Sequence, residues 1–222
     1  GMDFPYVRHS GGNFDSLIYN FHDFIGLSNS MRDGPDDQFR LLFERDGVTY
    51  LDLSSPESGI GDVQVTGAMR FGSFTLRGAV KAPTGDAEKL TGSGAMDVSL
   101  GIHGGGTGTL FNRDLSYSGF AGVLALGDGD VMPEFQRSVV PYAGAALRWH
   151  VTPRLALATQ LYAQGSYFDI DLDELGGNTF QLTFGGDYVF PKQKLLLRLA
   201  IAEDIAAAAA PDFALHLSIR KF

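Results

Sequence analysis

Four acidic residues lie close together between Phe168 and Glu174, where carboxylate oxygens could bind a hard cation. The spacing of Asp169, Asp171 and Asp173 resembles the start of a calcium-binding loop. The segment lacks the glycine at loop position six and the glutamate at position twelve that such a loop uses. We therefore rank a solvated acidic loop first and keep these three aspartates as weak metal candidates.

Hydrolytic and phosphate-binding chemistry are the other possibilities that the residue types raise. His103, His150 and His216 fall on polar strand faces, with Ser99 and Ser218 on strands as well. No G-x-S-x-G motif marks a nucleophile. The Gly-rich run at 104–108 is not followed by a helical pattern, so it does not match a phosphate-binding loop. We expect polar inward-facing side chains here, with no enzyme activity and no cofactor.

The composition limits the classes of protein to which the chain could belong. The chain has 222 residues, no cysteine and a net charge of -9, with 29 glycines and 12% aromatic residues. The lack of cysteine excludes disulfides and thiolate metal sites, and the acidic balance argues against nucleic acid as a partner. Glycine suits turns and aromatic residues suit pleated surfaces, which favours a single all-β domain over residues 1–222.

Alternation of apolar and polar residues predicts strands from residue 38 to the end. It is clearest in Leu195–Ile201 and Phe213–Ile219, where every second residue is apolar, and it also predicts strands over Ile60–Phe71 and Val139–His150. Several such segments exceed the ~5–6 residues typical of globular strands and reach the ~9–11 that a tilted transmembrane strand needs. We predict an antiparallel up-and-down transmembrane β-barrel of about 11–12 strands.

The predicted connections alternate between short turns and long acidic loops. Short turns fall at Arg45–Val48, Phe71–Ser73, Val151–Pro153 and Pro191–Gln193, and long loops at Leu53–Gly59, Ala82–Gly94, Gly127–Arg137, Phe168–Thr179 and Asp204–Pro211. Such asymmetry between rims is typical of outer-membrane barrels. With a periplasmic C-terminus every long loop falls outside, and the Gly-rich connection Gly104–Asp114 is the exception, a long periplasmic turn.

Residues 1–37 differ from the strands that follow. We predict residues 1–13 to be irregular, a short amphipathic helix over Phe14–Ile25, and a polar loop at Ser28–Asp37. If the helix only packs on the rim, His22 and Asp23 are exposed; a plug, a lid and an interfacial helix are the alternatives. A bacterial barrel starts in the periplasm with an even strand number, so we expect an odd number of N-terminal strands to be missing. The open alternative is that the helical segment is itself a strand.

The alternation also assigns residues to faces. In a membrane the polar faces line a lumen and the apolar faces meet lipid, whereas a soluble barrel inverts this. Strand length and turn asymmetry favour the membrane. The predicted lumen-facing residues are Arg70, Arg77, Lys81, Asp97, Arg148, His150, Asp187, Arg198, His216 and Arg220.

Several segments resemble one known family. They are Val7–Leu27, the segment KAPTGD at Lys81–Asp86 followed by GSGAMD at Gly92–Asp97, and AEDI at Ala202–Ile205 with APDFALHL at Ala210–Leu217. Together, and in this order, they resemble the uncharacterised outer-membrane β-barrel family called domain of unknown function 3187, from Gram-negative bacteria. The resemblance implies an outer-membrane location, and no activity or catalytic residues.

We therefore expect a porin-like protein of the bacterial cell outer membrane, a pore or passive transporter with a charged lumen. Its expected partners are lipid, lipopolysaccharide and an unknown small solute. A structural or adhesive outer-membrane protein with a lumen filled by side chains is the first alternative, and a soluble ligand-binding barrel is the second. An outer-membrane hydrolase ranks last.

Overall fold

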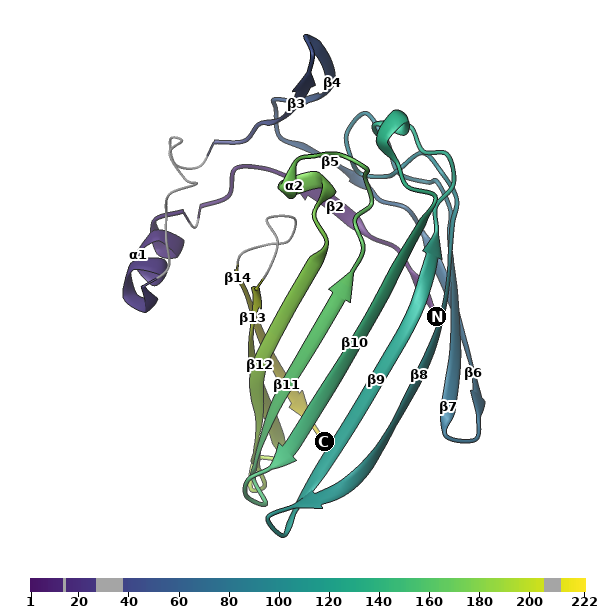
Figure 1. The fold of residues 1–222 in the computed structure, drawn as a ribbon. Coiled ribbons are helices and arrows are strands. Elements are labelled where there is room, and N and C mark those ends of the chain that lie inside the picture. Colours follow the sequence, from purple (N-terminus) through teal and green to yellow (C-terminus); the bar gives the residue numbers. More distant parts are fainter. Residues whose placement is uncertain (14, 27–37, 206–212) are drawn as a thin grey trace.

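The computed structural model describes residues 1–13, 15–26, 38–205 and 213–222. One curved antiparallel sheet of ten strands dominates it (Figure 1), and from β6 onward each strand pairs with the next along the chain. The predicted all-β, up-and-down architecture is thereby confirmed. The strands of this sheet are β1 (Met2–Asp3), β6 (Gln64–Phe71), β7 (Phe74–Lys81), β8 (Asp97–Leu110), β9 (Arg113–Ala125), β10 (Val139–His150), β11 (Leu155–Gln164), β12 (Thr179–Phe190), β13 (Leu195–Asp204) and β14 (Phe213–Lys221).

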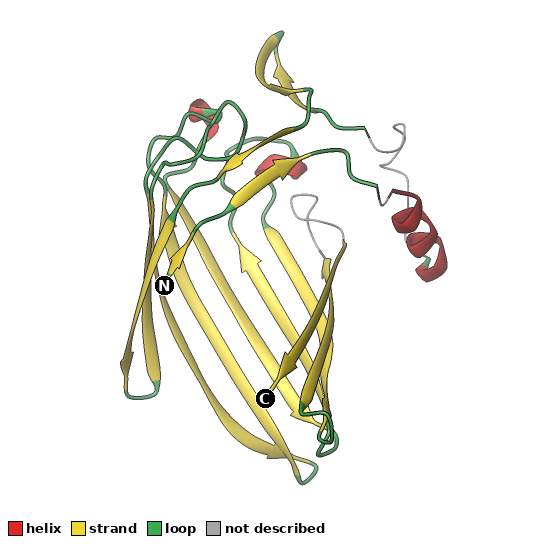
Figure 2. Cartoon of the chain, turned by 180° about the vertical axis from the view of Figure 1, so that it is seen from behind, coloured by secondary structure: helices red, strands yellow, loops and turns green. Residues whose placement is uncertain are grey.

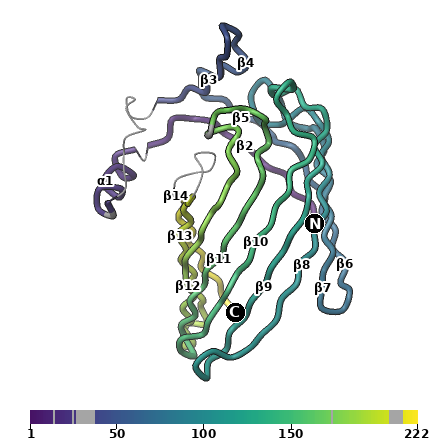
Figure 3. The backbone as a smooth tube through the Cα atoms, viewed as in Figure 1, coloured from purple at the N-terminus to yellow at the C-terminus, as the bar shows by residue number. Residues whose placement is uncertain are grey.

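The sheet has two unlike rims, which Figure 3 shows at the bottom and the top. At the turn rim, tight turns join β6 to β7, β8 to β9, β10 to β11 and β12 to β13. In the β8–β9 turn both Phe111 (φ 50°) and Asn112 (φ 57°) are left-handed, as a type I′ hairpin turn requires. At the loop rim the connections are long, including residues 82–96 and 126–138. Most of the predicted loop Asp204–Pro211 lies outside the described residues.

The smaller elements all lie at the loop rim. β2 (Tyr6–His9) pairs with β5 (Glu57–Ile60), and β3 (Leu41–Arg45) pairs with β4 (Val48–Leu53). The helix α1 (Asp15–Ile25) lies beyond the sheet in both Figure 1 and Figure 2, so the predicted helix is present. A 3-10 turn, η1 (Pro133–Phe135), and a short helix, α2 (Asp173–Gly176), complete the described elements. Among them no helix is long and apolar enough to cross a bilayer.

The N-terminal predictions need correction. Residues 1–13 are not irregular, because β1 pairs with β6 and β2 pairs with β5, partners that local sequence does not reveal. Simple packing of the helix on the rim would leave both His22 and Asp23 exposed, but only Asp23 is exposed and His22 is 4% exposed. Phe14 and the predicted polar loop Ser28–Asp37 lie outside the described residues.

Two of the predicted strands do not join the main sheet. β3 and β4, with 5 and 6 residues, are too short to span a bilayer and form a separate hairpin. Its Asp46-Gly47 turn therefore lies at the loop rim and not at the turn rim. The hairpin is held there by aromatic packing, because the ring of Phe135 lies 5.8 Å from Phe43 and 4.9 Å from Tyr50. The predicted strand Ile60–Phe71 also divides, into β5 and β6, with residues 61–63 between them.

The predicted Gly-rich connection Gly104–Asp114 is strand for most of its length. β8 runs through it to Leu110, and β9 begins at Arg113. The glycines are there because large rings lie against the backbone. A Cβ on Gly104 would meet the Phe74 ring at 3.0 Å, and one on Gly106 would meet the Tyr117 hydroxyl at 2.7 Å.

The sheet has one polar face and one apolar face. Following the register from Arg77 through Gly101, Gly122 and Tyr142 identifies the polar face, which we call the inner face. A single cavity on it is lined by strands from β1 to β11, so this face is concave. The outer face carries the apolar members of the alternation, including Leu215, Leu217 and Ile219 at 60%, 65% and 67% exposure.

The two edges of the sheet are formed by β14 on one side and by β6 with the two-residue β1 on the other. Nine strands lead from β6 to β14, so these two strands are parallel to one another although every neighbour is antiparallel. Among the described residues β14 pairs only with β13, and β1 covers only the first two residues of β6. Figure 2 shows the two chain ends at these opposite edges.

Candidate functional site

All ten predicted lumen-facing residues lie on the inner face. The strand register places them on this one face. For example, Lys81 lies opposite Asp97, Arg148 opposite Ala158, and Asp187 opposite Arg198. Their proposed role in lining a lumen is a prediction that this placement does not test. The structure brings some of them into direct contact and leaves others apart.

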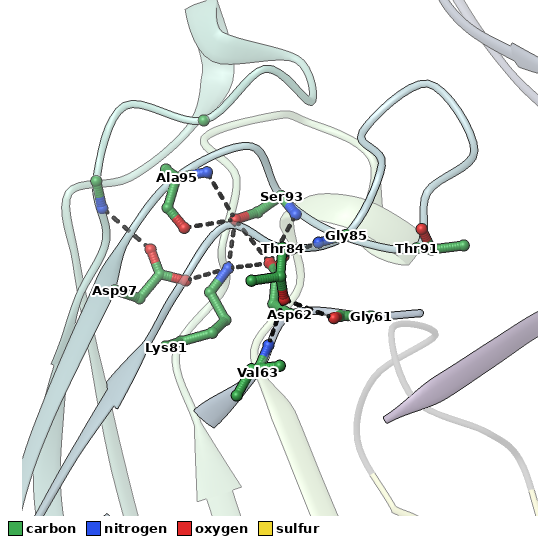
Figure 4. Close-up of polar contacts among 12 residues, drawn as sticks. Gly61, Asp62, Val63, Lys81, Thr84, Gly85, Thr91, Ser93, Ala95 and Asp97 are labelled. Carbon is green, nitrogen blue, oxygen red and sulfur yellow. Dashed lines mark hydrogen bonds and ion pairs between the residues drawn. The ribbon is translucent and has the colours of Figure 1, made fainter. Parts of the chain in front are cut away.

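A cluster of buried charges holds the loop rim where β6 and β8 begin and β7 ends (Figure 4). The Nζ of Lys81 lies 2.6 Å from a carboxylate oxygen of Asp62 and 2.8 Å from one of Asp97, and it also donates to the Ser93 hydroxyl. The three charged side chains are 22%, 7% and 9% exposed, in the order Lys81, Asp62, Asp97. We call these four residues the rim cluster.

Backbone N–H groups also donate hydrogen bonds to the Asp62 carboxylate. Its Oδ1 accepts from the Gly85 N–H and its Oδ2 from the Ser93 N–H, both at 2.9 Å. Burial alone raises the pKa of Asp62, but the hydrogen bonds from Lys81, Ser93 and Gly85 outweigh it and hold that pKa below its usual value. Thr84 fixes the same loop, because its hydroxyl donates to the Gly61 carbonyl and accepts from the Val63 N–H.

A second ionic group lies on the inner face of β10, β12 and β13. Asp187 is 3% exposed, and Arg198 donates to both of its carboxylate oxygens, at 2.6 and 3.0 Å. Arg148 lies 2.7 Å from the same carboxylate. Two cations thus share one anion, and the Nε of Arg148 has no partner among the described residues. The group carries a net positive charge.

Aromatic rings cover the inner face between these two ionic groups. The Phe120 ring stacks on His103 at 5.3 Å and lies 6.3 Å from Tyr142 and 6.2 Å from Tyr162. We call these four residues the aromatic wall.

Glycines on the inner face make room for the rings. A Cβ on Gly144 would meet Phe120 at 2.5 Å, and one on Gly101 would meet the Tyr142 hydroxyl at 2.6 Å. Any larger residue at these two positions would push the rings off the wall.

Two cavities open along the inner face beside the aromatic wall. One, of about 390 Å³, is lined by that wall together with Arg77, Gln64 and Gln164. Another, of about 380 Å³, lies between the rim cluster and the loop that carries Gln136. Both include Gln64, Ala79 and Ser99, so they adjoin. No described residue forms a hydrogen bond or ion pair with Arg77.

The remaining predicted residues stay separate. Arg70 donates to the Gly72 carbonyl at the turn rim, while among the described residues His150, His216 and Arg220 form no hydrogen bond or ion pair with the other charged groups. In the acidic segment Asp169 pairs with Arg137 at 2.5 Å. Across the described parts of the chain, no three His, Asp or Glu side chains are placed to hold a metal ion.

Sequence reasoning missed Asp62, Ser93 and the aromatic wall. Asp62 was placed within a continuous strand, whereas it leaves the sheet between β5 and β6. Ser93 belongs to the GSGAMD segment that carried the family resemblance, so that segment was the available signal. For the aromatic wall, the signal in the sequence was a glycine on each neighbouring strand. Such a glycine indicates a contact only when the strand register shows which ring lies against it.

Comparison with known proteins agrees with this architecture. No curated protein matches the chain. Among solved structures, the chain is similar to the COG4313 outer membrane channel from Pseudomonas putida F1, with 20% identity and a TM-score of 0.50. The similarity covers 74% of this chain and 66% of that one, so the chain spans just under two thirds of the channel's length. At this identity it supports the fold alone, that of an outer-membrane β-barrel.

The family assignment rests on the whole sequence. One family model, described as Protein of unknown function (DUF3187), matches residues 1–222. The KAPTGD and GSGAMD segments that suggested this family supply Lys81, Ser93 and Asp97 to the rim cluster. The chain belongs to the family described as Protein of unknown function (DUF3187).

Proposed function

We propose that the chain forms a passive pore in the bacterial outer membrane that favours small anions. The observation that carries this proposal is the two-faced sheet, with exposed apolar side chains outside and a locally positive middle of the inner face, where no described residue pairs with Arg77 and two arginines share Asp187. The similar solved structure is itself an outer membrane channel, which supports the same class of function.

The outer face is suited to lipid. Large apolar residues on it are exposed on strand after strand, including Leu100 at 52%, Leu157 at 48%, Phe184 at 58% and Leu199 at 48%. Soluble monomers rarely expose a contiguous apolar patch larger than a few hundred Å². A bilayer, with lipopolysaccharide in its outer leaflet, would cover this surface without cost.

The charge of the inner face differs from that of the whole chain. The protein carries a net charge of -9. The inner face carries Arg70, Arg77, Lys81, Arg148, Arg198 and Arg220 against Asp3, Asp97, Asp114, Asp187 and Asp204, and Asp62 contacts Lys81 at the rim, so the two signs balance in number. Its middle is locally positive, because no described residue pairs with Arg77 and two arginines share Asp187. Rings of positive side chains favour anions in pores, so the inner face, rather than the net charge, sets the expected selectivity.

Planar-bilayer recording tests the proposal. We expect the detergent-folded protein to give discrete current steps, and a reversal potential in a KCl gradient whose sign reports anion preference. Arg77→Glu should move that potential toward cation preference. Arg113→Glu is the matched control, because it makes the same change of charge on the outer face at the turn rim. It should move the reversal potential much less. Cation preference in the unchanged protein would contradict the charge argument.

The alternative is a structural or adhesive outer-membrane protein whose lumen is filled by side chains. The rim cluster and the Asp187 group favour it, because both place ion pairs on the inner face. Silence in the bilayer from a protein that circular dichroism shows to be β-folded would favour this reading. A soluble ligand-binding barrel requires the protein to stay monomeric without detergent, which size-exclusion chromatography would reveal.

A further inference from the structure

We propose that the inner face carries a binding site for a small aromatic carboxylate, formed by Arg77 and the aromatic wall. The inference names the solute class for the proposed pore and so rests on that function. It starts from a cavity of about 390 Å³ that contains one unpaired guanidinium beside several aromatic rings.

Arg77 is the group that would hold the carboxylate. It lines the cavity, and no described residue forms an ion pair or hydrogen bond with it, in contrast to Lys81, Arg148 and Arg198, which are all occupied by aspartates. A guanidinium binds a planar carboxylate with two parallel hydrogen bonds. Asp3 is the only carboxylate among the residues that line this cavity, and no ion pair joins it to Arg77.

The register places a tyrosine hydroxyl next to this arginine. Arg77 lies directly opposite Gly101 on β8, and the Tyr142 hydroxyl lies 2.6 Å from where a Cβ on Gly101 would be. Side chains directly opposite one another start only ~4.5–5.5 Å apart. A ligand oxygen held by Arg77 would therefore lie within reach of a second donor, the Tyr142 hydroxyl.

The aromatic wall supplies the surface for a flat ring. His103 and Phe120 are stacked with their planes 21° apart, and Tyr142 and Tyr162 flank Phe120. Offset stacking of rings adds to the gain from apolar burial. Because the glycine at Gly144 keeps Phe120 flat on the wall, the cavity beside it stays open.

Direct binding tests the site without any need for conductance. The probe is 4-fluorobenzoate, followed by fluorine NMR line broadening with the full chain folded in detergent micelles. We expect saturable binding that Arg77→Gln weakens by about tenfold or more, since a hydrogen-bonded charge is lost. Arg113→Gln, outside the cavity, should bind as the unchanged protein does. Far-UV circular dichroism on each variant reports whether it is folded.

Two further probes separate the contributions of charge and ring. 4-Fluorobenzyl alcohol keeps the ring without the charge, and a fluorinated cyclohexanecarboxylate keeps the charge without the ring; both should bind more weakly than 4-fluorobenzoate. Equal binding of all three probes, or equal binding by folded Arg77→Gln, would overturn the site. Binding without bilayer currents would leave the site intact and refute the pore, whereas currents without binding would do the reverse.

Discussion

Removing the cation of the rim cluster should destabilise the protein strongly. Lys81→Met leaves the carboxylates of Asp62 and Asp97 without the ammonium that both contact. Breaking a buried ion pair from one side costs ~3–5 kcal/mol. Because Lys81 is 22% exposed and backbone N–H groups still bind both carboxylates, we expect a loss at the lower end, ~2–4 kcal/mol.

Urea unfolding in lipid vesicles measures this loss. Trp149 is the single tryptophan, and its Nε1 donates to the Leu110 carbonyl at the turn rim, far along the sheet from the rim cluster. Its emission therefore reports unfolding of the sheet rather than the local change. With a urea dependence of ~1–3 kcal/mol/M, the midpoint should fall by roughly 1–2 M.

A matched substitution in the same loop provides the control. Lys89 pairs with Asp86 at 3.5 Å, but both side chains are nearly half exposed, at 47% and 46%. Exposed pairs contribute ~0–1 kcal/mol, so Lys89→Met should leave the midpoint nearly unchanged. If Lys81→Met costs no more than Lys89→Met, the rim cluster does not hold the loop rim. Adding Asp97→Asn to Lys81→Met should restore part of the loss.

Three further predictions follow from the faces, the wall and the rim. Leu199→Arg on the outer face should cost ~2–4 kcal/mol of folding in vesicles, and Ser218→Arg on the inner face less; equal costs would argue against this orientation. Gly144→Ala, whose Cβ would meet a ring at 2.5 Å, should lower the free energy of unfolding by ~1–3 kcal/mol, whereas Gly67→Ala meets nothing within 4 Å and should not. The pKa of Asp62 is lower in the folded than in the unfolded protein, so its carboxylate stabilises the fold above its usual pKa, and this stabilisation is lost as the pH falls through the lowered value. Asp62→Asn should therefore remove this part of the pH dependence of unfolding in vesicles below about pH 4.

The local pattern was sufficient for the long strands. Alternation depends only on neighbours along the chain, and it placed β10 at Val139–His150 as observed. It failed where pairing partners decide the outcome. Tyr6–His9 forms a strand only because Glu57–Ile60 lies beside it, and Leu41–Arg45 alternates well but pairs only with Val48–Leu53, in a hairpin separate from the main sheet.

The glycines were the harder part of the candidate site. In sequence, Gly101, Gly122 and Gly144 look like strand-weakening residues, and the run from Gly104 looks like a connection. Their role is set by a ring on another strand, which no spacing along one segment can reveal. A glycine on the inner face with an aromatic residue opposite it, one or two strands away, is the pattern to seek in related chains.

Cross-strand charge pairs also fix the register on which every site described above depends. Lys81 lies directly opposite Asp97, and Asp187 lies directly opposite Arg198. A slip of one residue in β7 or β13 would turn the cation to the outer face and leave a buried carboxylate behind. On the lipid side a Lys or Arg costs up to ~2–4 kcal/mol, in addition to the lost pair. The same charges that give the inner face its proposed selectivity therefore disfavour the pairings in which Arg77 and the aromatic wall would no longer meet.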